Sequence, residues 1–185
     1  MKVSLPDEVV TYDVASQLGS ELRKKGHFEE AKVFYVATLE GRRRALEEEH
    51  KKILDSSLNN MGVFLKNTKD YEGALEYYQQ ALRVQEKVLG KTHPDTLMTI
   101  TNMATVYMEG SKVFTKAEEL YRQALEGYEM PLGKDHKDTK KCVINLAIML
   151  YNKRASQELG CLIKEYPHLF QHPTAGERFK DFIGT

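Results

Sequence analysis

The chain has 185 residues and a mass of 21.2 kDa, with 27 Lys plus Arg, 27 Asp plus Glu and a formal net charge of zero. This size suits one compact domain or one short array of repeats, and without a cationic surplus we expect no nucleic-acid partner. No stretch approaches the ~20 apolar residues of a membrane span and the start lacks the apolar run of a signal peptide, so we expect a cytoplasmic protein with no membrane partner.

Helical periodicity predicts a series of helices in chain order, and strand-like alternation is not found at useful length. The expected helices span 7–25, 28–48, 52–67, 71–89, 94–109, 114–130 and 136–152. Pro94 and Asp95 mark one helix start, because proline tolerates the first helical position and a carboxylate suits the positive helix end. The residues expected in the left-handed backbone that ends a helix are Gly26, Gly90, Gly110 and Gly133.

A pattern with a period of 42 or 43 residues organises these helices. A small residue between bulky apolar ones recurs at Gly19, Gly62, Ala104 and Ala147. In the first three repeats a second small residue follows 12 or 13 positions later, and an aromatic residue stands four positions beyond it. Each repeat is therefore expected to contain two helices that pack against each other, and self-similarity of this period is typical of a repeat array.

The last part of the chain, 153–185, loses this pattern. A short helix is expected over 154–165, and a last turn bears Phe179 and Phe182. We therefore expect 1–152 to form the array, as three helix pairs plus the first helix of a fourth, and the remainder to be a divergent cap over the last repeat.

Four stretches carry a resemblance to a known family. They are His93-Pro94-Asp95-Thr96, Asn102-Met103-Ala104, Lys116-Ala117-Glu118-Glu119-Leu120-Tyr121-Arg122-Gln123-Ala124-Leu125 and Leu132-Gly133-Lys134-Asp135-His136. Together they closely resemble the tetratricopeptide repeat of kinesin light chain type, over roughly residues 10–152. The resemblance implies an all-α protein, a right-handed superhelix (α-solenoid) of antiparallel helix pairs. It also implies a concave groove, lined by the first helices, that binds peptide segments of partner proteins.

Several features depart from that family. Lys137 stands where the fourth repeat would carry proline, and we find no heptad segment of the kind that joins kinesin light chains to the motor. The resemblance therefore implies the repeat type and not association with a motor.

Helical geometry predicts which side chains of the first helices face the groove. Repeat spacing puts Asn102 in register with three other carboxamides, and a carboxamide both donates and accepts hydrogen bonds with a peptide backbone. The predicted peptide-binding residues are Gln17, Arg23, Asn59, Asn60, Lys66, Asn102, Thr105, Lys141 and Asn145. Because cations outnumber acids at the groove, acidic segments should be weakly preferred. The alternatives are asparagines that satisfy neighbouring helix backbone and charges that are merely solvated.

We expect neither a catalytic residue, nor a metal site, nor a cofactor. His50, His93 and His136 recur with the repeat, but they would lie at successive turns, too far apart for one metal ion. Cys142 and Cys161 are expected to be small apolar fillers. No nucleophile, base or cofactor loop is visible, so an enzyme is the least supported class of function.

The sequence favours a non-enzymatic scaffold or adaptor, and a structural role stays open beside it. In that alternative the array is an assembly subunit that homo-oligomerises through 153–185, and substitution of Phe179 and Phe182 should dissociate it while Asn102→Ala has no effect. In a self-regulating version the same segment folds into the groove.

Overall fold

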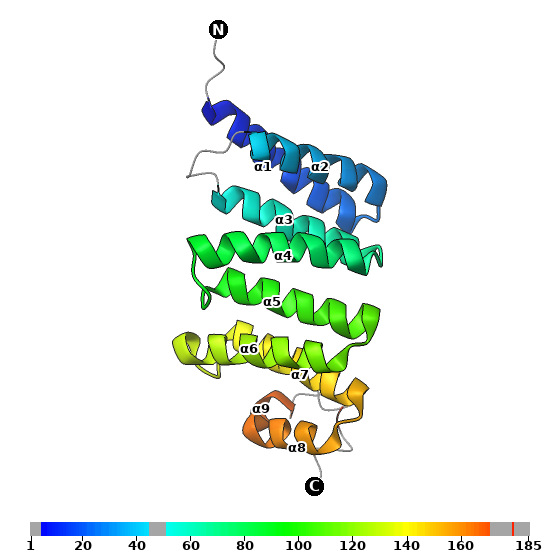
Figure 1. Ribbon diagram of the computed structural model, residues 1–185, viewed down its shortest axis with the longest axis vertical. Helices are drawn as coiled ribbons and strands as arrows, with labels where there is room; N and C mark the ends of the chain where they lie inside the picture. The colour runs from blue at the N-terminus through cyan, green and yellow to red at the C-terminus, as the bar shows by residue number, and fades with distance from the viewer. Residues whose placement is uncertain (1–4, 45–50, 171–178, 180–185) are drawn as a thin grey trace. The chain divides into compact units, whose positions relative to one another are not determined.

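The computed structural model describes residues 5–44, 51–170 and 179, and the chain divides into two compact units, Met1–Lys91 and Thr92–Thr185. Every regular element in the described part is helical, so the all-α expectation is confirmed. Figure 1 shows the helices in chain order.

The first unit consists of two helix pairs. Its helices are α1 (Leu5–Lys24), α2 (Phe28–Arg44), α3 (Lys51–Asn67) and α4 (Tyr71–Val88). α1 packs against α2, α3 packs against both α4 and α2, and the two first helices α1 and α3 also touch. The short connections within each pair make its helices antiparallel. Asp70 begins α4, because its Oδ1 accepts the backbone N–H of Gly73 at 3.0 Å.

The second unit begins with three long helices, each packed against the next. Its helices are α5 (Pro94–Val106), continued by a π-helical turn (Tyr107–Ser111), then α6 (Phe114–Leu132), α7 (Lys137–Lys153), α8 (Ser156–Glu165) and α9 (Pro167–Phe170). Consecutive helices pack against each other, and the first helices α5 and α7 are also in contact. The face shared by α5 and α7 is where the sequence places part of the groove.

Histidines begin both of these first helices. The Nδ1 atom of His93 accepts the backbone N–H of Asp95 at 3.2 Å, and Nδ1 of His136 accepts that of Asp138 at 3.3 Å. Pro94 occupies the first turn of α5, as predicted. The recurrence of histidine with the repeat therefore has a structural cause, because these imidazoles satisfy N–H groups that a helix start leaves unpaired.

The glycine predictions are confirmed at three positions and wrong at one. Gly26, Gly90 and Gly133 have φ values of 83°, 92° and 80°. Gly110 instead lies inside the π-helical turn, and the left-handed residue is Lys112, with φ 53°. The wider turn carries the helix past Gly110, and the N–H of Lys112 then closes it on the carbonyl of Tyr107.

The core follows the repeat pattern. The aromatic residues of the second helices, Tyr35, Tyr78 and Tyr121, are buried, as are the small residues that precede each of them by four positions. The bulky residues before the small position of the first helix are buried in α3, α5 and α7, but Leu18 in α1 is 44% exposed. Within the described residues no helix pair precedes α1 to add to the partial cover of Leu18.

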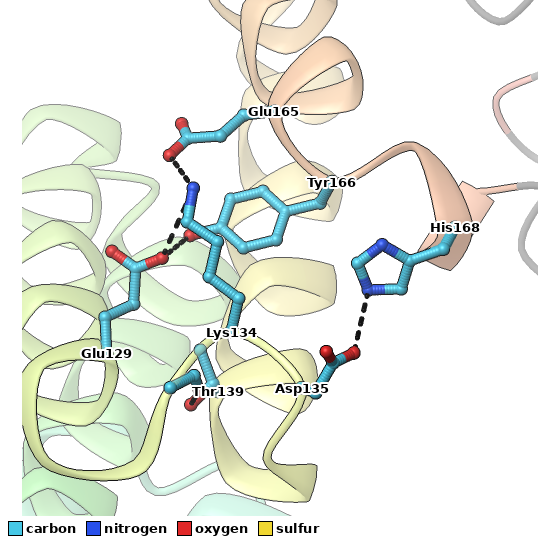
Figure 2. Close-up of polar contacts among 8 residues, drawn as sticks. Glu129, Lys134, Asp135, Thr139, Glu165, Tyr166 and His168 are labelled. Atoms are coloured by element: carbon cyan, nitrogen blue, oxygen red, sulfur yellow. Dashed lines mark hydrogen bonds and ion pairs between the residues drawn. The ribbon is translucent and has the colours of Figure 1, made fainter.

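A polar cluster fastens α8 to the turn between α6 and α7 (Figure 2). The hydroxyl of Tyr166, a fully buried residue, donates to the carboxylate of Glu129. Nζ of Lys134 lies 2.7 Å from Oε1 of Glu165 and 4.7 Å from the centre of the Tyr166 ring. The expected short helix of the last segment is therefore present and anchored.

Aromatic packing extends this anchor. The buried rings of Phe170 and Phe179 are 5.5 Å apart between centroids, and Phe179 also lies edge-on to Tyr151 of α7 at 5.9 Å. Phe182 lies outside the described residues. A cap that begins at residue 153 stays a prediction.

Candidate functional site

A small hollow opens on the second unit where α5 and α7 meet. Its volume is about 100 Å³, and three of the predicted binding residues border it, Asn102, Lys141 and Asn145. The complete lining is Pro94, Asp95, Met98, Thr101, Asn102, Tyr128, Asp138, Lys141, Cys142 and Asn145. Clefts for drug-sized ligands are usually about 300–1,000 Å³, so this hollow suits one side chain of a larger partner.

The two asparagines are equivalent positions of successive repeats. Asn102 on α5 and Asn145 on α7 are both half-buried. A carboxamide has two donor hydrogens and an acceptor oxygen with two lone pairs. It can therefore hold a contact within the protein and still bond an N–H or C=O group of an incoming backbone.

The wall between them comes from the second helix of the pair. Tyr128 of α6 is 4% exposed and its hydroxyl donates to the backbone carbonyl of Pro94 at 3.2 Å. Burial is the main cause that raises the pKa of Tyr128, and the nearby Cys142, Asp138 and Asp95 add to it. Both carboxylates also line the hollow, and neither is among the binding residues that the sequence predicts.

Thr105 has a different surrounding from the other predicted residues. Its Oγ1 lies 2.8 Å from the hydroxyl of Tyr121 and donates to the carbonyl of Thr101 at 3.0 Å. In the first unit the hydroxyl of Tyr35 likewise donates to Ser20, the equivalent of Thr105, at 3.2 Å. This position therefore joins the two helices of a repeat in both units. A contact of Thr105 with a partner stays a prediction.

The remaining predicted residues lie on α1 and α3 of the first unit. Gln17 is exposed, while Arg23, Asn59, Asn60 and Lys66 are half-buried. Arg23 and Lys66 stand four residues after the small position of their repeats, so they are equivalents. The first unit therefore presents two cations at one register of its first helices.

A wider depression lies between α7 and α8. It has a volume of about 480 Å³ and is lined by Leu150, Tyr151, Asn152, Arg154, Ala155, Ser156 and Leu159. Most of these residues follow the last clear repeat motif, so the periodic pattern gave no signal for them.

Within residues 5–44, 51–170 and 179, no group of three or more His, Cys, Asp or Glu side chains is arranged to hold a metal ion. In the same part of the chain no helix combines the length and apolar character that crossing a bilayer requires.

The two cysteines differ in environment. Cys142 is 1% exposed and burial raises the pKa of its thiol to about 12, whereas Cys161 is exposed, contrary to the expectation of an apolar filler. Because the thiolate is the reactive form, we expect a disulfide reagent at pH 8 to modify one cysteine in the native chain and both after denaturation. A colorimetric thiol assay measures this, and Cys161→Ser should remove the native reaction. Rapid labelling of Cys142 in the native protein would contradict the packing of α7.

Two family models described as tetratricopeptide repeat match residues 13–50 and 53–130, which together make up more than half of the chain. The chain belongs to the tetratricopeptide repeat family. No curated protein matches it in sequence.

Solved tetratricopeptide-like structures share this fold. The nearly identical TPR-like repeats of a protein described as a kinesin light chain of Podosopora anserina have a TM-score of 0.78 and 18% identity, covering 90% of this chain and 81% of that one. BtubC (BKLC) from P. vanneervenii has a TM-score of 0.76 and 14% identity, covering 99% and 83%.

The apo form of RapI has a TM-score of 0.78 and 16% identity, with 94% of this chain aligned to 47% of RapI. At these identities the likeness concerns the fold alone. A kinesin-light-chain-like α-solenoid is therefore confirmed, and tetratricopeptide arrays are modules of protein–protein interaction.

Proposed function

We propose that the first-helix faces of this tetratricopeptide protein bind an extended segment of a partner protein and catalyse no reaction. The observation that carries the proposal is the meeting of Asn102 and Asn145 at the hollow between α5 and α7. One carboxamide from each of these two repeats hydrogen-bonds the backbone of the bound segment, and the hollow between them receives one of its side chains. A prefolded helical scaffold adds little ordering cost of its own, so the partner segment bears most of it.

The asparagines alone supply modest affinity. At a net ~1 kcal/mol per hydrogen bond, two such residues contribute on the order of 2 kcal/mol, about thirtyfold in Kd. Contacts with side chains of the bound segment supply the rest of the binding free energy. The hollow is therefore the place where specificity arises.

In the first unit, Arg23 and Lys66 support the preference for acidic segments. Both are half-buried cations at the same repeat position of α1 and α3. Lys24, in contrast, already pairs with Glu21 at 2.7 Å. Each exposed charge pair contributes little and is screened by salt. Raising the salt concentration should therefore weaken the preference for acidic segments before it weakens the hydrogen bonds of the asparagines.

The test begins with peptides selected from a displayed random library on the full chain. Synthetic copies are titrated by fluorescence anisotropy. We expect the Asn102→Ala, Asn145→Ala double variant to weaken binding by about thirtyfold, whereas Gln123→Ala, an exposed carboxamide on α6, should leave it unchanged.

Selected peptides that bind the double variant as tightly as the wild type would overturn the groove proposal. Light scattering on the same proteins distinguishes the assembly alternative. A dimer that persists in the double variant, together with no selected peptide, would favour a structural subunit.

A further inference from the structure

We infer that the hollow between α5 and α7 receives a basic side chain, lysine or arginine, of the bound segment. The inference rests on the proposed function and names the chemistry that the second unit selects. It separates this unit from the first, whose first helices carry the cations Arg23 and Lys66.

Two carboxylates border the hollow from successive repeats. Asp95 stands at the start of α5 and Asp138 at the start of α7, 43 residues apart, and both line the cavity together with Tyr128. Both also raise the pKa of the Tyr128 hydroxyl, after burial as the main cause, which agrees with their place in this lining. A cation in the hollow would therefore lie between two negative charges contributed by different helices.

A histidine stands beside each of these carboxylates. Nδ1 of His93 is 3.7 Å from Oδ2 of Asp95, and Nδ1 of His136 is 3.6 Å from Oδ2 of Asp138. Each Nδ1 also accepts a backbone N–H, as the helix caps show, so the imidazoles fix the helix starts at which the two carboxylates stand.

The apolar part of the hollow matches the stem of a basic side chain. Met98 is 39% exposed although it is large and apolar, and it faces the cavity beside the buried Tyr128. Lysine and arginine bury their methylene groups on such surfaces while their charged heads remain near polar groups. An acidic side chain would offer a shorter stem and would meet like charge.

The acidic position is specific to the second unit. Nine residues before the small position of each repeat stand Val10, Ile53, Asp95 and Asp138 in turn. The carboxylates are thus confined to the two repeats that form the hollow, and the first unit has aliphatic residues at the equivalent places.

Lys141 distinguishes a basic ligand side chain from an acidic one. It lies exposed at the rim of the hollow, at the repeat position that Met98 occupies on α5. If the hollow holds a cation, the ammonium of Lys141 repels it; if the hollow holds an acid, the same ammonium attracts it. Removing Lys141 therefore shifts affinity in opposite directions for the two ligand types.

The experiment uses the full chain and twelve-residue peptides selected from a displayed random library. For a selected binder, the basic residue is exchanged for methionine, which keeps the length of the side chain. We expect this exchange to weaken binding about tenfold, and the Asp95→Asn, Asp138→Asn double variant to lose the same factor and to bind both peptides equally. Lys141→Ala should tighten binding of the basic peptide two- to fivefold, by about the value of one exposed charge pair.

Glu126→Gln, which removes an exposed charge elsewhere on α6, is the matched control and should change nothing. Circular dichroism melting verifies that the variants are folded. Binders that contain no basic residue, a double variant that still discriminates between the peptides, or weaker binding after Lys141→Ala would overturn the inference. Those outcomes leave the proposed function standing, because it fails only when selected binders are indifferent to Asn102 and Asn145 or when none is found.

Discussion

Replacing Gly62 with valine is expected to destabilise the first unit by about 3 kcal/mol, because the close approach of α3 and α4 leaves no space for a side chain there. A Cβ atom at Gly62 would lie 2.6 Å from Cε1 and 2.7 Å from Cδ1 of the Tyr78 ring. Tyr78 is fully buried, so its ring cannot move aside without disturbing the core of the pair. Urea denaturation followed by circular dichroism measures the change in the free energy of unfolding.

The matched control is Gly160, inside α8. A Cβ atom added there has no heavy atom within 4 Å, so Gly160→Ala should gain up to about 1 kcal/mol through helix propensity alone. A Gly62→Val variant as stable as the wild type would mean that α3 and α4 pack less closely than the structure shows.

The same position illustrates what the sequence predicts and what it does not. Periodicity identified Gly62 and Ala104 as equivalent small residues, and both are buried. It could not tell that one repeat excludes even a methyl group, because that depends on the distance between two helices. Helix existence, caps and inward faces were predictable since they depend on residues within a turn or two of each other.

Long-range polar contacts escaped prediction for a related reason. Glu118 looks like a solvated position of α6, yet its carboxylate accepts from Nζ of Lys153 at 2.8 Å and from Arg122 at 2.9 Å. These hydrogen bonds lower the pKa of Glu118 despite the opposing effect of desolvation, which is the largest single cause. A partner 35 residues away on α7 leaves no periodic signal.

For the candidate site the sequence carries a signal that has two explanations. Asp95 is a favourable charge at a helix start, which explains one carboxylate locally. An acid recurs at Asp138, whereas the equivalent positions of the first unit carry none. This pattern indicates a binding role only once the structure shows that Asp95 and Asp138 line the same hollow. Asn102 and Asn145 were predictable because their register alone places them on one face.

Tyr166→Ala is expected to destabilise the second unit by about 4 kcal/mol, since it removes a fully buried aromatic ring from the anchor of α8. Burial, reinforced by the Glu129 carboxylate, raises the pKa of the Tyr166 hydroxyl, which therefore stays protonated and keeps donating. Tyr166→Phe retains the ring and should lose only about 1 kcal/mol, because the half-buried Glu129 can turn to water. Denaturant unfolding measures both values.

The exposed Met130 of α6 supplies the comparison for the alanine variant. Its side chain is 76% exposed, so Met130→Ala should change the free energy of unfolding by less than about 0.5 kcal/mol. If Tyr166→Ala changes the free energy of unfolding as little as Met130→Ala does, α8 and the polar cluster of Figure 2 contribute little to the stability of the unit. If the loss is large and hydrogen exchange speeds up in α7 as well as α8, the last segment supports the helix that carries Lys141 and Asn145. The anchor would then be a requirement for the binding face as well as for the cap.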